Sequence, residues 1–190
     1  MTELHTRLRP VIDAVEARRD GGTFVVLSMD GMAAAGKTTA AEYLSALWDA
    51  PVVHMDDFFL PPALRTPERL SQPGGNVHYE RFAAEVLPAL TRGEAFSYRP
   101  FSCALMSYAP AIAIPASGVV IVEGAYAMHP AFGDYADVTA FFAIEPEEQK
   151  RRILRREAAK WEDFRTRWIP METAYHEAFQ IKDKADVVVE

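Results

Sequence analysis

The stretch "SMDGMAAAGKTT", residues 28–39, has the residue types and the spacing of a loop that holds phosphate. Two glycines separated by four residues and followed by Lys37 and Thr38 fit the pattern G-x-x-x-x-G-K-[ST]. In such a loop the main-chain N–H groups surround the phosphates, and the helix that follows presents its positive end. Lys37 is expected to reach the β- and γ-phosphates, and the Thr38 hydroxyl to help hold Mg²⁺. We expect these residues to contact the nucleotide: Gly31, Ala33, Ala34, Ala35, Gly36, Lys37, Thr38 and Thr39.

Acidic residues follow two of the apolar runs. Asp56 and Asp57 come after "PVVHM", and Glu123 ends "VVIVE". Ligands of an open parallel sheet bind beyond the carboxyl ends of its strands, so these acids are expected to face the phosphate loop. Asp56 is predicted to take the proton of an acceptor hydroxyl or to hold Mg²⁺, and Glu123 to be the second acid of the metal site. For Asp57 an acidic turn or a helix cap is the favoured interpretation, and His54 in the preceding strand is interpreted as structural.

A basic helix is predicted over residues 146–161, "PEEQKRRILRREAAKW". A charged face in contact with solvent is one interpretation of it. The other is a lid over about residues 155–170, whose arginines pair with ATP phosphates and neutralise charge during transfer. Helical spacing puts Arg152 on one side with Arg155 and Arg156. We predict that Arg155 and Arg156 contact the nucleotide and that Arg155 also acts in catalysis.

The segments around the phosphate loop alternate between strand and helix patterns. Residues 3–19 repeat apolar side chains at helical spacing, and "TFVVLSM" predicts a buried strand. A helix over "KTTAAEYLSALWD" and a strand over "PVVHM" follow the loop. This order of strand, loop, helix and strand is typical of a parallel sheet.

The remainder of the chain predicts an insertion and three more strands. Residues 60–76 are rich in proline, glycine and charge and indicate an irregular segment, residues 78–93 a helix, and "FSYRPF" with "AIAIP" a small β-ribbon. The runs "GVVIVEGAY", "VTAFFAI" and "ADVVV" predict strands, and a further helix lies near 168–179. We predict an α/β fold of the P-loop NTPase type with three layers. Its central, mostly parallel sheet of about five strands has helices on both faces, with the β-ribbon and a helical lid added.

Composition narrows the classes of partner. The 190 residues are 49% hydrophobic and 25% charged, and the net charge of -7 argues against general attraction to nucleic acid or to an anionic membrane. The single cysteine, Cys103, excludes an intramolecular disulfide and is expected to be a small buried hydrophobe. No apolar run is long enough for a membrane span, and the N-terminal residues do not resemble a signal peptide, so a cytoplasmic location is expected. The sequence does not indicate a homo-oligomer, although it is compatible with one.

With these residues assembled, the chain resembles the uridine kinase/phosphoribulokinase family of P-loop kinases, most closely its short bacterial uridine kinase-like members. The phosphate loop is shared widely, whereas the segments "MDDFF", "PGGNVHYERF", "SYRPF" and "VIVEGAYAMHP", in that order, are specific. The resemblance covers nearly the whole chain, including "DYADVTAFFAIEPEEQKRRILRRE" and "WIPMETAYHEAFQIKDKADVVV". It implies a single P-loop kinase domain over residues 1–190, with an acceptor-side insertion at about 58–117.

The resemblance also implies residue roles. Asp56 would be the catalytic base, Thr38 and Glu123 would belong to the Mg²⁺ site together with Asp56, and Arg155 would lie in the lid over ATP. The expected acceptor is a nucleoside or another small molecule that carries a hydroxyl. The residues expected to bind it are Phe59, Asn76, His78, Tyr79, Arg99, Phe101 and Tyr126.

Two positions depart from the family pattern. Relatives usually carry an acid where this chain has His78, and that acid commonly binds the ribose hydroxyls. Relatives also commonly show Tyr-Asp where this chain has Phe101-Ser102. The machinery for transfer therefore looks complete, while the acceptor pocket looks altered.

Three hypotheses for function follow from these residues. The first is an ATP- and Mg²⁺-dependent kinase, a phosphotransferase with an alcohol group as acceptor, acting on a nucleoside-like molecule. The second is a kinase for a non-nucleoside acceptor such as a vitamin precursor or a sugar. The third is a nucleotide-binding regulator whose acceptor site has decayed, against which the retained Asp56 and Glu123 argue. A GTPase switch is disfavoured because no Asn-Lys-x-Asp segment is present.

Overall fold

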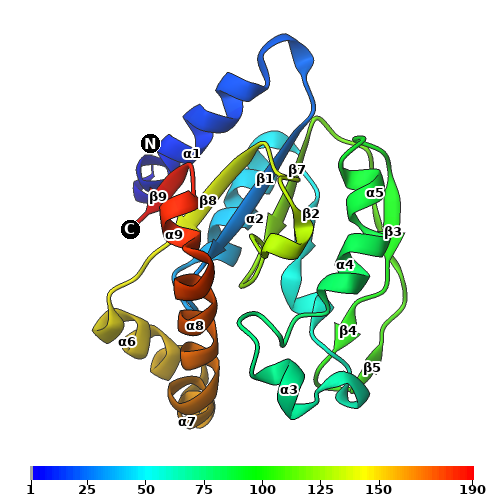
Figure 1. Cartoon of the computed structure of the whole chain (residues 1–190). Helices are drawn as coiled ribbons and strands as arrows, with labels where there is room; N and C mark the ends of the chain where they lie inside the picture. The colour runs from blue at the N-terminus through cyan, green and yellow to red at the C-terminus, as the bar shows by residue number, and fades with distance from the viewer. Residues whose placement is uncertain (1) are drawn as a thin grey trace.

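The computed structural model describes residues 2–190, and a parallel sheet of five strands forms its centre (Figure 1). The strand order is β2-β7-β1-β8-β9, and every neighbouring pair runs parallel. The first strand in the chain is thus central, with later strands added on both sides. The loop that follows it lies where the strand order reverses, which is the usual ligand position in open α/β sheets. The strands are β1 (Val25–Gly31), β2 (Val52–His54), β7 (Val119–Glu123), β8 (Val138–Phe142) and β9 (Val187–Val189).

Helices cover both faces of this sheet, as predicted. On one face α1 (Glu3–Arg18) and α2 (Lys37–Trp48) bury Leu8 and Leu44 against β1. On the other, Phe82 of α4 (Tyr79–Glu85), Leu90 of α5 (Leu87–Leu90) and Tyr175 of α8 (Ile169–Phe179) are buried. Side chains of β1 alternate between the two cores, Val25 and Leu27 facing α1 and α2 while Val26 faces the other layer. The predicted three-layer α/β fold is confirmed.

The helix predicted over residues 78–93 is divided into α4 and α5. The break falls at Val86, whose φ of -108° and ψ of -54° depart from regular helix, two residues before Pro88. Proline has no N–H to donate, and its ring crowds the carbonyl group four residues earlier. The apolar spacing was correct for burial, but a single continuous helix was the wrong prediction.

The insertion contains two small antiparallel ribbons. The predicted ribbon is confirmed as β3 (Phe96–Tyr98) paired with β6 (Ile112–Ile114). Inside it, β4 (Phe101–Ser102) pairs with β5 (Ser107–Tyr108). Cys103 lies in the turn between β4 and β5 and is exposed, so the prediction that it is buried was wrong. Before the ribbons, the irregular segment contains η3 (Pro62–Leu64) and α3 (Pro67–Leu70).

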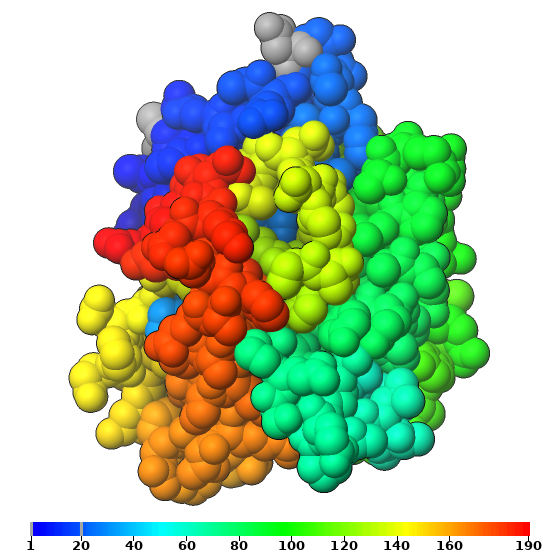
Figure 2. All heavy atoms as spheres, viewed as in Figure 1, coloured from blue at the N-terminus to red at the C-terminus, as the bar shows by residue number. Residues whose placement is uncertain are grey.

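A run of helices follows β8; its first part, α6, lies across the molecule from the insertion (Figures 1 and 2), whereas Tyr175 of α8 adjoins Gly74 of the insertion. In Figure 2 the insertion is green, and the segment from α6 to α9 runs from yellow to red. The segment consists of α6 (Pro146–Glu157), η5 (Ala158–Lys160), α7 (Trp161–Asp163), the π-helical turn η6 (Phe164–Trp168), α8 and α9 (Ile181–Lys184). Short 3-10 turns elsewhere are η1 (Asp20–Gly22), η2 (Met55–Phe58) and η4 (Pro130–Phe132). Within residues 2–190 no helix has the length and apolar character that crossing a membrane requires.

Candidate active site

The phosphate loop connects β1 to α2 and has an unusual main-chain conformation. Gly31, with a φ of 134°, ends β1 so close to β8 that a Cβ there would collide with the main chain of Phe142. Ala34 (φ 59°) and Gly36 (φ 99°) lie in the left-handed region. A turn that includes such residues directs successive N–H groups into a concave surface suited to an anion. The small side chains predicted from sequence are therefore matched by a loop with the required shape.

The side chains of Lys37 and Glu172 form hydrogen bonds with the main chain of this loop. Lys37 is 8% exposed, and its Nζ donates to the carbonyl oxygens of Gly31 and Met32 at 2.7 and 3.0 Å. The Ala33 amide donates to the Glu172 carboxylate of α8 at 2.8 Å. Burial raises the pKa of Glu172, although the charge of Lys37 opposes that shift. One amide of the loop is thus occupied by a carboxylate oxygen of the protein itself.

Beside the loop, Thr38, Glu123 and His54 form a polar cluster. The Thr38 hydroxyl lies 3.4 Å from both carboxylate oxygens of Glu123, which is 5% exposed at the end of β7. His54 is paired in register with Glu123 across β2 and β7, and its Nδ1 lies 2.6 Å from Glu123 Oε1. This hydrogen bond raises the pKa of His54. His54 was interpreted as structural, and periodicity alone gave no signal that its neighbour in the sheet would be an acid.

Asp56 and Asp57 have different surroundings in η2. The Asp57 carboxylate accepts a hydrogen bond from the Tyr98 hydroxyl at 2.8 Å, which ties the insertion to the end of β2. Asp56 retains exposed surface, yet enough protein surrounds its carboxyl group that partial desolvation raises its pKa. The charge of Glu123 adds to this shift, and that of Lys37 opposes it. A raised pKa makes Asp56 a stronger base than an ordinary aspartate.

The residues present fit a magnesium ion whose coordination shell is completed by oxygens of a bound substrate. Among the residues that the structure describes, no three His, Cys, Asp or Glu side chains are close enough to form a metal site by themselves. Mg²⁺ usually takes only one or two carboxylates and completes its shell with phosphate oxygens and water. Glu123, the Thr38 hydroxyl and Asp56 could supply the protein's share of such a shell.

The predicted acceptor-binding residues lie in the insertion and around its junction with the sheet. His78 is the N-cap residue before α4, where its Nδ1 accepts from the Arg81 amide at 3.3 Å. Tyr79 stacks on His129 with 4.7 Å between ring centroids, and the Arg69 guanidinium covers its other face. Asn76 Oδ1 is buried without a hydrogen-bond partner among the described residues.

The other residues predicted to bind the acceptor already pack against, or form hydrogen bonds with, other parts of the protein. Phe101 is 3% exposed and packs edge-on against Tyr108. Arg99 donates to the Tyr108 and Ala109 carbonyl oxygens and so ties the ribbon together. Tyr126 is 2% exposed, and burial raises the pKa of its hydroxyl. Phe59 is half-buried and forms an isolated bridge with Val77.

On α6, it is Arg152 that meets the phosphate loop. Its Nη1 donates to the Ala34 carbonyl oxygen at 3.2 Å, and its Nε donates to Glu148 at 2.7 Å. Arg155 and Arg156 are exposed, and the Arg156 Nε lies 3.2 Å from a carboxylate oxygen of Glu157. In this conformation the structure therefore brings Arg152 to the loop and leaves the two arginines predicted from sequence facing solvent.

Asp30 is a further charged residue that sequence reasoning missed. Its carboxylate is completely buried and accepts hydrogen bonds, 2.6 to 3.2 Å long, from the Gly31, Tyr126 and Met128 amides and the Tyr175 hydroxyl. Burial alone would raise the pKa of Asp30, but nearby His176 and the donated hydrogen bonds lower it. The signal was an acid inside the apolar strand "VVLSMDG". Asp30 fixes the start of the phosphate loop to α8 and to the segment after β7.

Comparison with known proteins identifies the fold. Neither protein-family models nor curated proteins match the sequence. Among solved structures, the chain is similar to a possible uridine kinase from Bacillus stearothermophilus, with a TM-score of 0.71 and 20% identity over 100% of both chains. It is also similar to a proposed fructose transport system kinase from Silicibacter sp. TM1040, with a TM-score of 0.66 and 22% identity over 99% of both. A protein from Thermus thermophilus follows with a TM-score of 0.51 and 16% identity over 87% of both.

The chain therefore has a P-loop NTPase fold of the kind found in small kinases. The resemblance to uridine kinase-like P-loop kinases is confirmed at the level of this fold, over the full length of the chain. A fold does not define a reaction, so the chemistry has to be argued from the residues of this chain.

Proposed function

We propose that the protein is an ATP- and Mg²⁺-dependent small-molecule kinase that transfers the γ-phosphoryl group of ATP to a hydroxyl of a nucleoside-like acceptor. The observation that carries the proposal is the arrangement at the carboxyl edge of the sheet. There a phosphate loop with a buried Lys37 lies beside two carboxylates, Glu123 and Asp56, whose charges affect one another. A site that only binds nucleotide and metal would need the loop and one acid such as Glu123, but not a second carboxylate beside them.

In this reaction Asp56 accepts the proton of the acceptor hydroxyl. The acceptor oxygen forms a bond to the γ-phosphorus while the bond from that phosphorus to the bridging oxygen of ADP breaks. The charge on the transferred group is neutralised by Lys37, and Arg155 is proposed to add to this from the lid. Main-chain amides among residues 33–39 hold the remaining phosphates.

Thr38, Glu123 and Asp56 are the residues proposed to hold Mg²⁺. When bound, the metal would neutralise phosphate charge and orient the phosphates for in-line transfer. The proposal is supported by the contact between Thr38 and Glu123 and by the hydrogen bond of His54, which orients the Glu123 carboxylate from the neighbouring strand.

The acceptor is proposed to bind against the insertion, near Phe59, Asn76 and His78. A non-nucleoside acceptor is the second candidate, because His78 replaces the expected acid and because one structural neighbour is a proposed kinase for fructose transport. Both acceptors carry hydroxyl groups, so the reaction is the same and only recognition differs.

A thermal-shift screen tests the proposal and identifies the acceptor. Nucleosides, sugars and vitamin precursors would be added in the presence of Mg²⁺ and a non-hydrolysable ATP analogue. We expect the analogue to raise the unfolding temperature, and one acceptor class to raise it further, because ligands that bind only the folded state stabilise it. Stabilisation by the analogue, with no turnover of ATP on any acceptor, would instead favour a nucleotide-binding regulator.

A further inference from the structure

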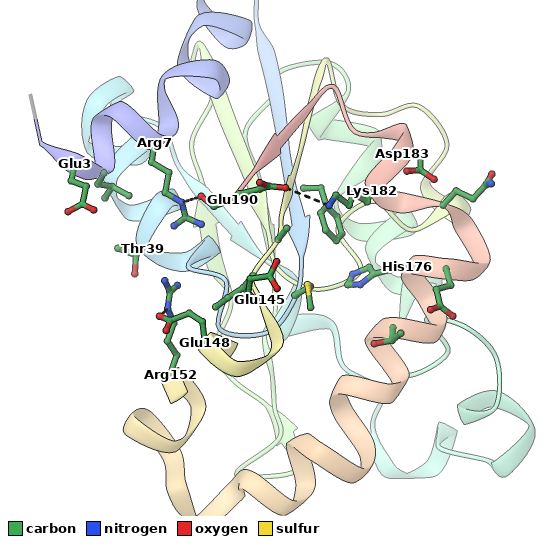
Figure 3. A pocket seen from close by; sticks show the side chains of 18 residues that line it. Glu3, Arg7, Thr39, Glu145, Glu148, Arg152, His176, Lys182, Asp183 and Glu190 are labelled. Carbon is green, nitrogen blue, oxygen red and sulfur yellow. Dashed lines mark hydrogen bonds and ion pairs between the residues drawn. The ribbon is translucent and has the colours of Figure 1, made fainter. Parts of the chain in front are cut away.

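A cavity opens beside the phosphate loop on the side away from Asp56. Its volume is about 1130 Å³, and its walls come from α1, the end of β8, α6 and the end of α8 (Figure 3). Thr39, the last residue of the predicted phosphate-binding set, lies in its wall. A ligand whose phosphates lie in the loop would therefore have room to extend past Thr39 into this cavity.

Two arginines from different helices meet at this end of the loop. Arg7 of α1 donates from Nη2 to the Ala35 carbonyl oxygen at 3.2 Å, and Arg152 of α6 donates from Nη1 to the Ala34 carbonyl oxygen at the same distance. A Cβ added to Gly36 would lie 3.5 Å from Arg7 Nη1 and 3.9 Å from Arg152 Nη1. Figure 3 shows both side chains reaching toward the same stretch beside Thr39. The two guanidinium groups thus flank Gly36.

Arg7 has hydrogen-bonding capacity that the protein does not use. Its Nε donates to the Glu190 main-chain oxygen at 2.8 Å, but within residues 2–190 its Nη1 has no hydrogen-bond partner and no acidic side chain pairs with it. Burial and then the charge of Arg152 lower the pKa of Arg7, so its environment is unfavourable to the cation. A second arginine beside the first repels it, unless an anion is bound between them.

We propose that Arg7 is a nucleotide-binding residue that, with Arg152, holds the phosphate chain of the donor where it leaves the loop for the cavity. This inference rests on the proposed function, because it takes the donor to be a nucleoside triphosphate. Guanidinium groups bind phosphate oxygens through paired N–H groups, and Arg7 has an unused nitrogen, Nη1, beside Gly36 of the loop. The N-terminal helix is then part of the donor site, not only part of the scaffold.

The competing interpretation is that Arg7 only ties α1 and β9 to the loop. Isothermal titration calorimetry of wild type, Arg7→Gln, Arg7→Lys and the control Arg9→Gln separates the two, with ATP, tripolyphosphate and adenosine as ligands. Arg9 is on the same helix, exposed, and paired with Asp13 at 2.7 Å, so its loss should change none of the affinities. The proposal predicts that Arg7→Gln weakens binding of ATP and of tripolyphosphate about 10-fold or more and leaves adenosine unchanged.

Each outcome of this experiment decides between the alternatives. If wild type binds ATP and Arg7→Gln binds it equally well, the role of Arg7 is wrong while the proposed kinase stands. Equal weakening of all three ligands would mean that Arg7 is only structural. If wild type binds neither ATP nor tripolyphosphate, the proposed function itself fails, and the role of Arg7 with it.

Folding of the variants is checked by circular dichroism before titration. Should Arg7→Gln not fold, Arg7→Lys decides, because lysine keeps the charge but cannot offer paired N–H groups. The proposal then predicts ATP binding several-fold weaker than wild type with adenosine unchanged, and wild-type affinity for ATP would contradict it.

Discussion

Asp30 and Glu172 place two carboxylates next to a loop whose amides are suited to anions. Asp30 stabilises the loop from beneath, because its four donors come from the loop itself, from the segment after β7 and from α8. Glu172 instead lies at the loop surface, where its carboxylate accepts from the Ala33 amide. The first carboxylate is therefore a structural element of the site, and the second occupies a donor that an anionic ligand could use.

The Asp30→Asn variant is expected to lose stability that depends on pH. The folded-state pKa of Asp30 is lowered from its ordinary value of 3.8, so the ionised form stabilises the fold above that pH, and this contribution is lost as the pH falls through the lower folded-state pKa. We expect Asp30→Asn to reduce the free energy of unfolding by about 2 kcal/mol or more at neutral pH. We also expect a smaller further loss than in wild type as the pH falls from about 5 to about 2.

Urea unfolding at several pH values measures this difference. Asp13→Asn is the matched control, because Asp13 is an exposed acid on α1. Equal pH dependence in wild type and Asp30→Asn would show that the pKa of Asp30 is not lowered by folding.

His78 offers a test of the acceptor site that does not disturb the fold. His78 caps α4 through its Nδ1, and aspartate is an equally suitable cap, so His78→Asp should unfold at nearly the wild-type temperature. His78→Ala should lose about 1 kcal/mol of stability with the cap. If His78 faces the acceptor, the new carboxylate accepts hydrogen bonds from ribose hydroxyls, and the KM for a nucleoside should fall. A KM that is unchanged for every acceptor would place His78 outside the acceptor site.

At the scale of elements, α6 and α8 approach the phosphate loop from different directions. Arg152 of α6 donates to a carbonyl oxygen of the loop. From α8, Glu172 accepts from a loop amide, and Tyr175 donates to Asp30, the buried carboxylate beneath the loop. Between these helices lie η5, α7 and the π-helical turn η6, a type of turn found frequently at functional sites. The predicted lid, residues 155–170, is thus joined at both ends to elements that contact the loop.

The arginines of α6 are expected to differ in kinetic role. Arg152→Gln should raise the dissociation constant for ATP, because Arg152 is already at the loop. Arg155→Gln should leave ATP binding unchanged and lower kcat by about 10²-fold or more, if the lid brings Arg155 to the transferred group only during transfer. Equilibrium titration and steady-state kinetics separate these effects. Wild-type kcat in Arg155→Gln would remove Arg155 from the mechanism.

Individual elements show which parts of the fold sequence patterns can predict. Strands such as "TFVVLSM" and "GVVIVEGAY" were predicted because burial on both faces leaves uninterrupted apolar runs. The break at Val86 was missed because apolar spacing outweighed Pro88 in the interpretation. The contact of His54 with Glu123 depends on which strands are neighbours, and β2 and β7 are separated by more than sixty residues of chain. Local periodicity carries no information on such pairings.

For the whole molecule, the sequence motifs and their order say more about the fold than overall sequence similarity does. No protein-family model matches the chain, yet the order of its short segments predicted a fold that full-length structural neighbours confirm. The set of site residues stays a prediction. Arg152 and Arg155 lie less than one helical turn apart on α6, so sequence spacing does not distinguish which of them contacts the nucleotide. Their roles depend on the conformation of the lid, which sequence spacing does not specify.

The central claim, that the protein transfers phosphate to a small-molecule hydroxyl, is tested most directly by acceptor-dependent ADP release in wild type and Asp56→Asn. The assay uses ATP, Mg²⁺ and the acceptor found by thermal shift, and titration calorimetry confirms that both proteins bind ATP. We predict turnover in wild type and a loss of about 10²- to 10⁴-fold in Asp56→Asn with ATP affinity retained, because the variant lacks the proton acceptor. Equal turnover in the two proteins, or no acceptor-dependent release in wild type, would contradict the account.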